Sequence, residues 1–266
     1  MLIINIIFYG IIYNIINIPF DNGANMLGSK NSPKVFAPYL NFLDIDKKFN
    51  INTNNFISNI IGEGYRSALI SLHDNKIPIT IGGDHTVAVS SVFASNKYCN
   101  IINKTLGVLW CDAHADFNTV HTSYTKNIHG MPVSILCGHT LEYLEISDRL
   151  LPSQFLYYGL RDIDSMEFLR FQDYNMAILD NNNDLDEWIN NYDYIHVSFD
   201  IDCLDPSVTE CVNTPVKNGK TVDEVKDLFT KIKLSNKLCA LDIVEYNPNN
   251  SESPEIIIDI VKELLV

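Results

Sequence analysis

The chain has 266 residues, of which 46% are hydrophobic and 20% charged, a balance typical of a globular protein rather than a disordered one. Its net charge of −14 argues against a nucleic-acid partner, because no stretch is basic enough to follow a phosphate backbone. The six cysteines form no CxxC pair and lie mostly in apolar runs. We therefore expect free thiols, a reducing compartment and a cytoplasmic location.

The first 20 residues, MLIINIIFYGIIYNIINIPF, are mostly apolar and long enough to suggest a membrane span. They lack a basic n-region and a small-residue cleavage site, and asparagines and a proline interrupt them. We expect a core strand at 13–18 after a possible hydrophobic extension at 1–12, and no membrane association. A signal sequence or anchor is the alternative.

Along the rest of the chain, short apolar runs alternate with amphipathic stretches. This alternation predicts an α/β fold with a mainly parallel sheet that helices cover on both faces. No repeat or low-complexity linker is present, so we expect one domain over 1–266 with a loop at 244–254. Thr221 and Glu224 form a capping-box pattern before a helix. Strands are predicted at 13–18, 77–81, 105–111, 154–159, 176–179, 194–199 and 238–243, and helices near 34–44, 54–74, 86–95, 132–137, 164–172, 184–191, 222–233 and 254–265.

The predicted strand 105–111 runs directly into Asp112, His114 and Asp116. Alternate residues of a strand share one face, so these three side chains would lie on the same side. A continued strand would spread the outer two over ~13 Å. Bonds to one ion are only roughly 2–2.5 Å long. Either the chain curls where the strand ends, or the triplet serves two ions.

Two other predicted strands end in side chains of the same kinds. GGDH (82–85) follows 77–81, and Asp200 and Asp202 follow 194–199. Open α/β sheets place ligands at the carboxyl ends of their strands. Each cluster alone could be a turn or a helix cap, but burying carboxylates without a cation costs several kcal/mol. Six candidate metal ligands result: His85, Asp112, His114, Asp116, Asp200 and Asp202.

The charge of this set favours two divalent cations, because four aspartates balance two such ions while the histidines are neutral. Oxygen ligands with some imidazole suit Mn²⁺ better than a structural zinc ion, which prefers thiolates. A water molecule between two such ions ionises near neutral pH and becomes a nucleophile.

Seven stretches in this order resemble the ureohydrolase (arginase/agmatinase) family: GGDHT (82–86), DAHADFNT (112–119), NIHGMPVS (127–134), GLRDID (159–164), SFDIDCLDPS (198–207), NTPV (213–216) and EYNP (245–248). Together they cover about residues 10–266. The resemblance implies a single arginase-like three-layer α-β-α domain, two Mn²⁺ per chain and a homotrimer or homohexamer. The family's six metal ligands coincide with the six residues named above.

The resemblance also implies roles for residues of the pocket. Asp116 would accept protons from the metal-bridging hydroxide, His129 would shuttle protons, and Glu245 would hold the substrate guanidinium. Further substrate contacts would come from Asn118 and Thr125 to the α-carboxylate, from Asp164 and Glu167 to the α-amino side, and from Thr214.

Several positions depart from the family pattern. Thr125 and Lys126 stand where the family usually has Ser and Gly, and NTPV and EYNP replace the usual GTPV and EVNP. The N-terminal VExGP-like stretch is reduced to LGSKNSP (27–33). These changes spare the metal ligands and bear on substrate specificity.

The resemblance implies an enzyme that hydrolyses L-arginine to L-ornithine and urea. The alternatives are agmatinase or another ureohydrolase, and a catalytically silent structural or regulatory member. The form HGMPVS favours arginine over agmatine, and a silent member should have lost metal ligands that this chain retains. A histone-deacetylase-like hydrolase would need a single-metal set, which the paired DxHxD and DxD do not match.

Overall fold

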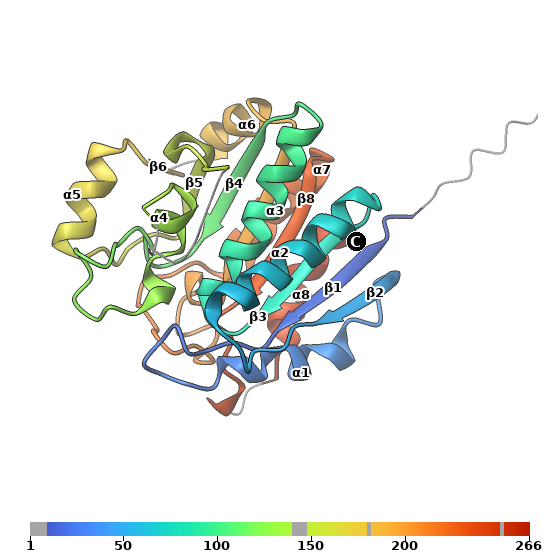
Figure 1. Ribbon diagram of the computed structural model, residues 1–266, viewed down its shortest axis with the longest axis horizontal. Coiled ribbons are helices and arrows are strands. Elements are labelled where there is room, and N and C mark those ends of the chain that lie inside the picture. Colours follow the sequence, from blue (N-terminus) through green and yellow to red (C-terminus); the bar gives the residue numbers. More distant parts are fainter. Residues whose placement is uncertain (1–9, 140–147, 180–181, 251–252) are drawn as a thin grey trace, which may run out of the picture.

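The computed structural model describes residues 10–139, 148–179, 182–250 and 253–266, so most of the predicted extension lies outside the described residues. A parallel sheet in the order β2-β1-β3-β8-β7-β4-β5-β6 forms its centre (Figure 1). The strands are β1 Tyr13–Ile18, β2 Ile45–Asn50, β3 Ile77–Gly82, β4 Leu106–Cys111, β5 Phe155–Tyr158, β6 Ala177–Ile178, β7 Tyr194–Asp200 and β8 Leu238–Val244. The α-helices are α1 Ser32–Phe36, α2 Ile57–His73, α3 Ala88–Ile101, α4 Pro132–Leu136, α5 Ser165–Asp173, α6 Asn182–Asn190, α7 Val222–Leu234 and α8 Glu255–Leu265.

The predicted parallel α/β architecture is confirmed, with two local differences. Strand β2 (IDKKFN) was not predicted, because it is an edge strand whose exposed lysines hide any apolar run. The helix predicted at 34–44 is wrong in extent: α1 ends at Phe36 and a 3₁₀ turn, Ala37–Tyr39, follows. Pro38 in that turn has no backbone N–H with which to continue the helix.

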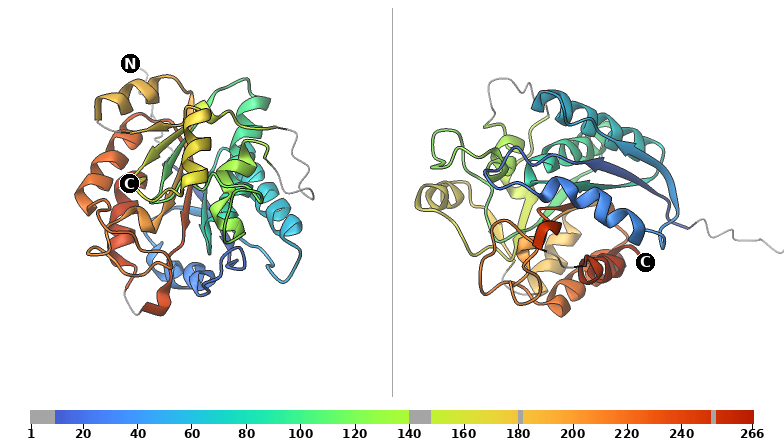
Figure 2. Two further views of the ribbon diagram at one scale, coloured as in Figure 1. Left: turned by 90° about the vertical axis from the view of Figure 1, so that its left-hand side faces the viewer. Right: turned by 90° about the horizontal axis from the view of Figure 1, so that it is seen from below.

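Helices cover both faces of the sheet and bury its central strands. Helices α2 and α3 lie on one face and α7 and α8 on the other, as the side views show (Figure 2). In β4, Leu109 packs in the core on the α7 and α8 side, while Trp110 packs on the α3 side, and both are fully buried. Such two-sided burial explains why the central strands appear in the sequence as continuous apolar runs. Among the helices of the described residues, none combines the length and apolar character needed to cross a bilayer.

The strand order brings the predicted ligands together. The connection from β3 to β4 crosses the two positions in the sheet that β8 and β7 occupy. The carboxyl ends of these four neighbouring central strands therefore lie side by side. Between β7 and β4 the direction of the chain across the sheet changes, because β4 leads to β5 on one side and β7 leads to β8 on the other. Open parallel sheets bind ligands at the carboxyl ends of the strands at such a point.

The capping box predicted for α7 is present and allows a test of local stability. The Thr221 hydroxyl accepts a hydrogen bond from the Glu224 amide (3.3 Å), and the Glu224 carboxylate accepts one from the Thr221 amide (2.9 Å). We expect Thr221→Ala to lower the free energy of unfolding by about 1 kcal/mol, because an amide of the first turn loses its acceptor. Urea denaturation would measure this loss. Thr221→Ser keeps the acceptor and should match the wild type; equal stability of all three proteins would refute the role of the cap.

Candidate metal centre

Three strand ends position the predicted ligands. His85 opens the 3₁₀ turn His85–Val87 between β3 and α3, and the Asp84 carboxylate caps that turn by accepting the Thr86 amide. Asp112 is the first residue after β4. Asp200 ends β7, and Asp202 lies in the next 3₁₀ turn, where its amide donates to the Asp200 carboxylate (2.8 Å).

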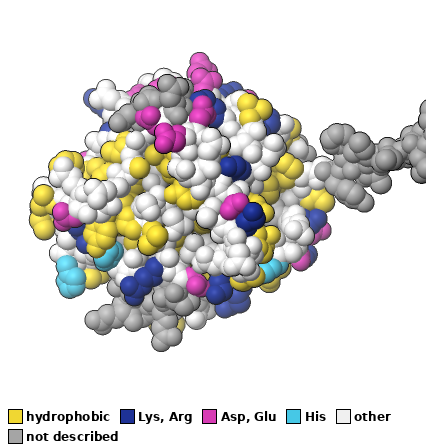
Figure 3. Space-filling view, turned by 90° about the horizontal axis from the view of Figure 1, so that it is seen from above, with side chains coloured by type: hydrophobic (Ala, Val, Ile, Leu, Met, Phe, Trp, Pro, Cys, Tyr) yellow, Lys and Arg dark blue, Asp and Glu magenta, His cyan; other side chains and the backbone are white. Residues whose placement is uncertain are grey.

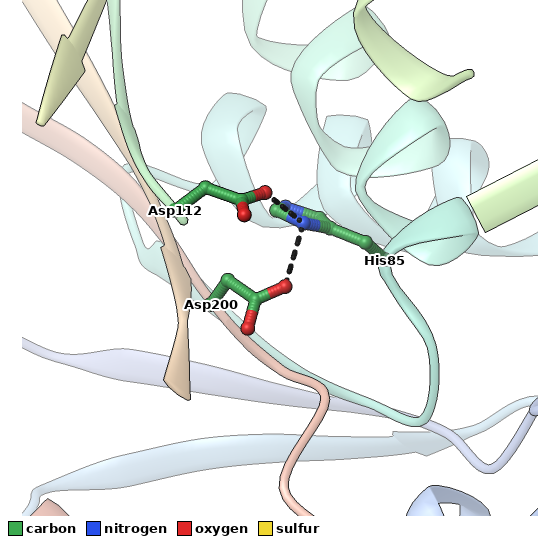
Figure 4. A group of neighbouring side chains, drawn as sticks. All are labelled: His85, Asp112 and Asp200. Atoms are coloured by element: carbon green, nitrogen blue, oxygen red, sulfur yellow. Dashed lines mark ion pairs between the residues drawn. The ribbon is translucent and has the colours of Figure 1, made fainter. Parts of the chain in front are cut away.

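The first group of donors surrounds the Nδ1 atom of His85. This atom lies 3.0 Å from Asp112 Oδ2, 3.0 Å from Asp200 Oδ2 and 3.2 Å from Asp116 Oδ2. Figure 4 shows the carboxylates of Asp112 and Asp200 pointing toward the imidazole from neighbouring strand ends. His85, Asp112 and Asp200 could hold one cation, and the Asp116 carboxylate lies beside them.

The second group of donors consists of Asp112, His114 and Asp202. His114 Nδ1 lies 3.0 Å from Asp202 Oδ2 and 3.4 Å from Asp112 Oδ1. Asp112 therefore belongs to both groups and turns one oxygen toward each. The arrangement can accommodate two cations with a shared carboxylate.

The backbone turns where the strand ends, which is one of the two possibilities that the sequence left open, and the triplet also divides between the two groups of donors. Strand β4 ends at Cys111, before the triplet begins, and Asp116 adopts a positive φ of 50°. A left-handed conformation costs an aspartate about 1–3 kcal/mol and persists where surrounding contacts fix it. The curl places Asp116 beside His85, while His114 points to the other group.

Neighbouring side chains orient the donors. The Nε2 atom of His85 hydrogen bonds to the Ser198 hydroxyl (2.9 Å), which leaves Nδ1 for a metal. The same imidazole stacks on Trp110 at 4.1 Å, and the Trp110 indole N–H donates to Asp112 Oδ2 (3.0 Å). The Thr214 hydroxyl donates to Asp202 Oδ2 (3.1 Å). Contacts of this kind fix the tautomer and the direction of metal ligands.

The electrostatics of the first group fit a cation. His85 Nδ1 and Asp116 Oδ2 are buried and have no hydrogen-bond partner, although buried polar atoms in proteins are nearly always paired. Burial, with the charges of Asp202 and Asp112, raises the pKa of Asp200 well above its usual range. A divalent ion would bind the orphaned atoms and offset the repulsion between the carboxylates, and the oxygen-rich donor set suits a hard ion.

A pocket of about 220 Å³ opens above the two groups. It brings together every predicted site residue except Asp112, which lies beneath it, and Thr125. The Thr125 side chain is exposed, and its hydroxyl accepts the Asn127 amide (3.2 Å). Residues predicted from the family resemblance that line the pocket are Asn118, His129, Asp164, Glu167, Thr214 and Glu245.

A His129–Glu245 pair forms one wall. The two side chains meet through Nδ1 and Oε1 at 2.9 Å, and the same carboxylate oxygen accepts the His85 amide (2.9 Å). Glu245 has a positive φ of 61°, and its second oxygen, Oε2, is buried without a hydrogen-bond partner. Burial lowers the pKa of His129, but the hydrogen bond and charge of Glu245 outweigh burial and raise it to about 9.

The opposite wall is a network around the start of α5. The side-chain amide of Asn118 donates to Asp164 Oδ2 (2.8 Å). Asp164 Oδ1 caps α5 by accepting hydrogen bonds from the backbone amides of Met166 and Glu167. Glu167 Oε1 accepts the Phe117 amide (2.7 Å), and burial raises the pKa of Glu167 to about 8. The wall thus offers carbonyl and carboxylate oxygens and a carboxyl group that is easily protonated.

The structure explains two of the departures from the family pattern, Lys126 and Asn213. Lys126 has a φ of 62°, a conformation that favours the usual glycine, and its ammonium donates to the Val120 carbonyl (2.8 Å) instead of entering the pocket. The Asn213 side chain accepts a hydrogen bond from Asn247 (2.6 Å) and donates to the Met26 carbonyl (3.2 Å). It thereby ties three loops together where a glycine could not.

Sequence reasoning missed several contributors. Asp162 lines the pocket with a carboxylate 3.7 Å from His114 Nε2, and Gly130 also lines it. Asp162 sits two residues before Asp164 in GLRDID, a spacing that could have identified it. Ser198 and Trp110 lie inside apolar runs, where no pattern separates them from core residues.

Comparisons with known proteins place this geometry in context. The Arginase family model matches residues 13–266. An arginase of Staphylococcus aureus (strain MRSA252) is 34% identical over 194 residues, which are 67% of this chain and 63% of the relative. An arginase of Saccharomyces cerevisiae is 33% identical over 220 residues, 72% of this chain and 64% of the relative. The chain thus spans a little under two thirds of either relative.

The fold has a close counterpart among solved structures. The structure of Entamoeba histolytica arginase in complex with L-ornithine superposes with a TM-score of 0.89 at 24% identity, over 96% of this chain and 98% of that one. The arginase-like three-layer fold expected from the sequence is confirmed.

Cation binding by the shared carboxylate can be tested directly. A divalent cation at 100 times its Kd should raise the free energy of unfolding by about 2.7 kcal/mol, because it binds the native state. We expect Asp112→Asn to lose most of this stabilisation, since both donor groups lose one charge. Thermal denaturation with and without Mn²⁺ would measure it. Asp186→Asn, an exposed change on α6, should retain the full shift; an undiminished shift in Asp112→Asn would refute the shared site.

Proposed function

The chain belongs to the arginase family, and on this basis we propose that it is a manganese-dependent enzyme that hydrolyses the guanidinium group of L-arginine to L-ornithine and urea. The observation that carries the proposal is the pair of donor groups sharing Asp112 beneath a pocket that Glu245 and His129 also line. The related Entamoeba histolytica enzyme, solved with L-ornithine, supports the choice of product.

We assign two Mn²⁺ ions to the donor groups. His85, Asp112, Asp116 and Asp200 would hold one ion, and Asp112, His114 and Asp202 the other. When bound, two such ions lower the pKa of a water molecule and so supply a nucleophile near neutral pH. The Asp116 carboxylate would bind the first ion through Oδ2, which has no hydrogen-bond partner, and would accept the released proton at its other oxygen.

Glu245 is the proposed partner of the guanidinium group. Its Oε2 atom is buried and free, while Oε1 is already bonded to His85 and His129. A guanidinium offers a planar fork of N–H donors that a carboxylate oxygen can accept. Thr214, held against Asp202, borders the same space.

His129 is the proposed proton carrier. Its Nδ1 atom is bonded to Glu245, so Nε2 remains for proton exchange in the pocket. The hydrogen bond and charge of Glu245 raise the pKa of His129 to about 9, which favours the protonated imidazole that would donate to the departing amine of ornithine.

The α-amino and α-carboxylate groups would contact the wall at α5. Asp164 and Glu167 would accept from the α-amino side, and Asn118 would contact the α-carboxylate. The assignment of Thr125 to the carboxylate requires the loop at 119–127 to move toward the pocket when substrate binds.

We further propose a single cytoplasmic domain that assembles as a homotrimer or homohexamer. Several large apolar side chains are exposed on and beside α5 and β6, including Phe168, Leu169 and Ile178. Hydrophobic side chains gather toward the left of the view in Figure 3, the side on which Figure 1 places these elements. Light scattering would give the mass.

Agmatinase is the second candidate. Thr125 lies outside the pocket and Lys126 turns away from it, which leaves Asn118 to recognise the carboxylate that agmatine lacks. Asn118 is itself engaged by Asp164 and Thr122.

Substrate choice separates the two candidates. A site built to hydrogen bond a group can reject an analogue without it by ~10⁴–10⁵, because its own polar atoms stay unpaired. We expect kcat/KM for arginine to exceed that for agmatine by at least ~10², a lower figure because fewer carboxylate contacts are preformed. Urea release by the Mn²⁺-loaded protein would measure both. Equal efficiency would contradict the arginine assignment and leave the ureohydrolase chemistry standing.

The role of His129 can be separated from metal binding. His129→Ala should keep the metal content of the wild type and lower kcat by ~10²–10⁴, the range for loss of a general acid. Steady-state kinetics with elemental analysis would show both. His121→Ala, an exposed change in the same loop, is the control and should leave kcat unchanged. Near-normal turnover by His129→Ala would disprove proton transfer through this residue.

A further inference from the structure

The guanidinium group of Arg161 binds only main-chain carbonyl oxygens among the described residues. Its shortest hydrogen bonds run from Nη2 to Asp202 O (2.7 Å) and Val216 O (2.7 Å), and from Nη1 to Gly159 O (2.8 Å). Longer bonds, of 3.2–3.3 Å, reach the carbonyls of Cys203, Leu204 and Lys217.

These carbonyls belong to three separate segments. Gly159 follows β5, residues 202–204 form the turn after β7, and residues 216–217 follow Thr214. The main chain at Arg161 reaches a fourth segment. The backbone amides of Arg161 and of the next residue, Asp162, both donate to the Ala113 carbonyl (2.9 Å each). Ala113 lies between Asp112 and His114.

Several of these contacts lead to the second donor group. The Asp202 carbonyl that Arg161 binds belongs to a ligand, and the Ala113 carbonyl lies between the other two ligands. Thr214 donates to Asp202 Oδ2, and Arg161 binds the carbonyls of Val216 and Lys217, which follow Thr214 in the chain. The hydrogen bonds of the Arg161 side chain do not extend to His85 or Asp200.

We propose that Arg161 is a positioning residue for His114 and Asp202, the two ligands that belong to the second donor group alone. The inference rests on the proposed function insofar as that function assigns an ion to each group. The planar guanidinium with its five N–H donors can serve carbonyls from three directions, whereas the ammonium of a lysine has only three donors. Without the guanidinium, the 202–204 turn and the segment after Thr214 lose the hydrogen bonds that Arg161 donates to both, and keep the backbone pairing near Lys220.

The test is metal binding by Arg161→Lys and Arg161→Gln. Both variants should bind a first Mn²⁺ ion as the wild type does and a second one at least ~10-fold more weakly, the range seen when groups that orient metal ligands are removed. Titration with elemental analysis gives the two affinities. Electron paramagnetic resonance should show the spin-coupled Mn²⁺ pair of the wild type giving way to an isolated ion.

Lys237 provides a matched control. This half-buried cation also binds main-chain carbonyls, those of Ile189 (2.9 Å) and Tyr192 (2.8 Å). It lies just before β8, at the amino-terminal end of the strand, whereas the donor groups lie at the carboxyl ends of the strands. Lys237→Gln should therefore lose thermal stability while it keeps both ions at wild-type affinity and the coupled signal.

The outcomes separate this role from the proposed function. Two ions at wild-type affinity in Arg161→Lys would overturn the positioning role and leave the dinuclear site intact. Equal weakening of both ions, or an unfolded Arg161→Lys by near-ultraviolet circular dichroism, would overturn it in favour of a general structural role. A single ion in the wild type would overturn both the dinuclear assignment and the role of Arg161.

Discussion

The structure depends on the Asp112 carboxylate, which is shared between two groups of buried acids and imidazoles. Its oxygens lie 3.0 Å from His85 Nδ1 and 3.4 Å from His114 Nδ1, so neither group is complete without it. Four buried aspartates repel one another, and in a medium from which water is excluded this repulsion is costly unless cations neutralise it. The net charge of −14 is in part the charge of a site suited to cations.

The fold meets this cost by placing the acids where they can all face one space. The central strands β3, β8, β7 and β4 end side by side, and helices cover both of their faces. Asp116 and Glu245, two of the residues at positive φ, lie at this end of the strands. Such strain is found where function requires a side chain to point in a particular direction. The sheet therefore supplies the framework, and the irregular segments after its strands supply the chemistry.

The sequence predicted the parts of this arrangement that depend on periodicity, and fewer of the parts that depend on loops. Apolar runs located the central strands, and their parallel order then placed His85, Asp112 and Asp200 at one edge. Strand β2 was missed because its pairing lies in backbone hydrogen bonds beneath lysine side chains. The contact of His129 with Glu245 joins residues 116 positions apart, and the resemblance, not a residue pattern, suggested that they share a site. The position of Thr125 outside the pocket depends on a loop conformation that no periodicity encodes.

The central claim, that two ions share one carboxylate, is most directly tested by anomalous diffraction at the manganese edge from crystals grown with Mn²⁺. The account predicts two peaks of comparable height, one between His85, Asp112 and Asp200, and one between Asp112, His114 and Asp202. A single peak, or two peaks that Asp112 does not bridge, would contradict it.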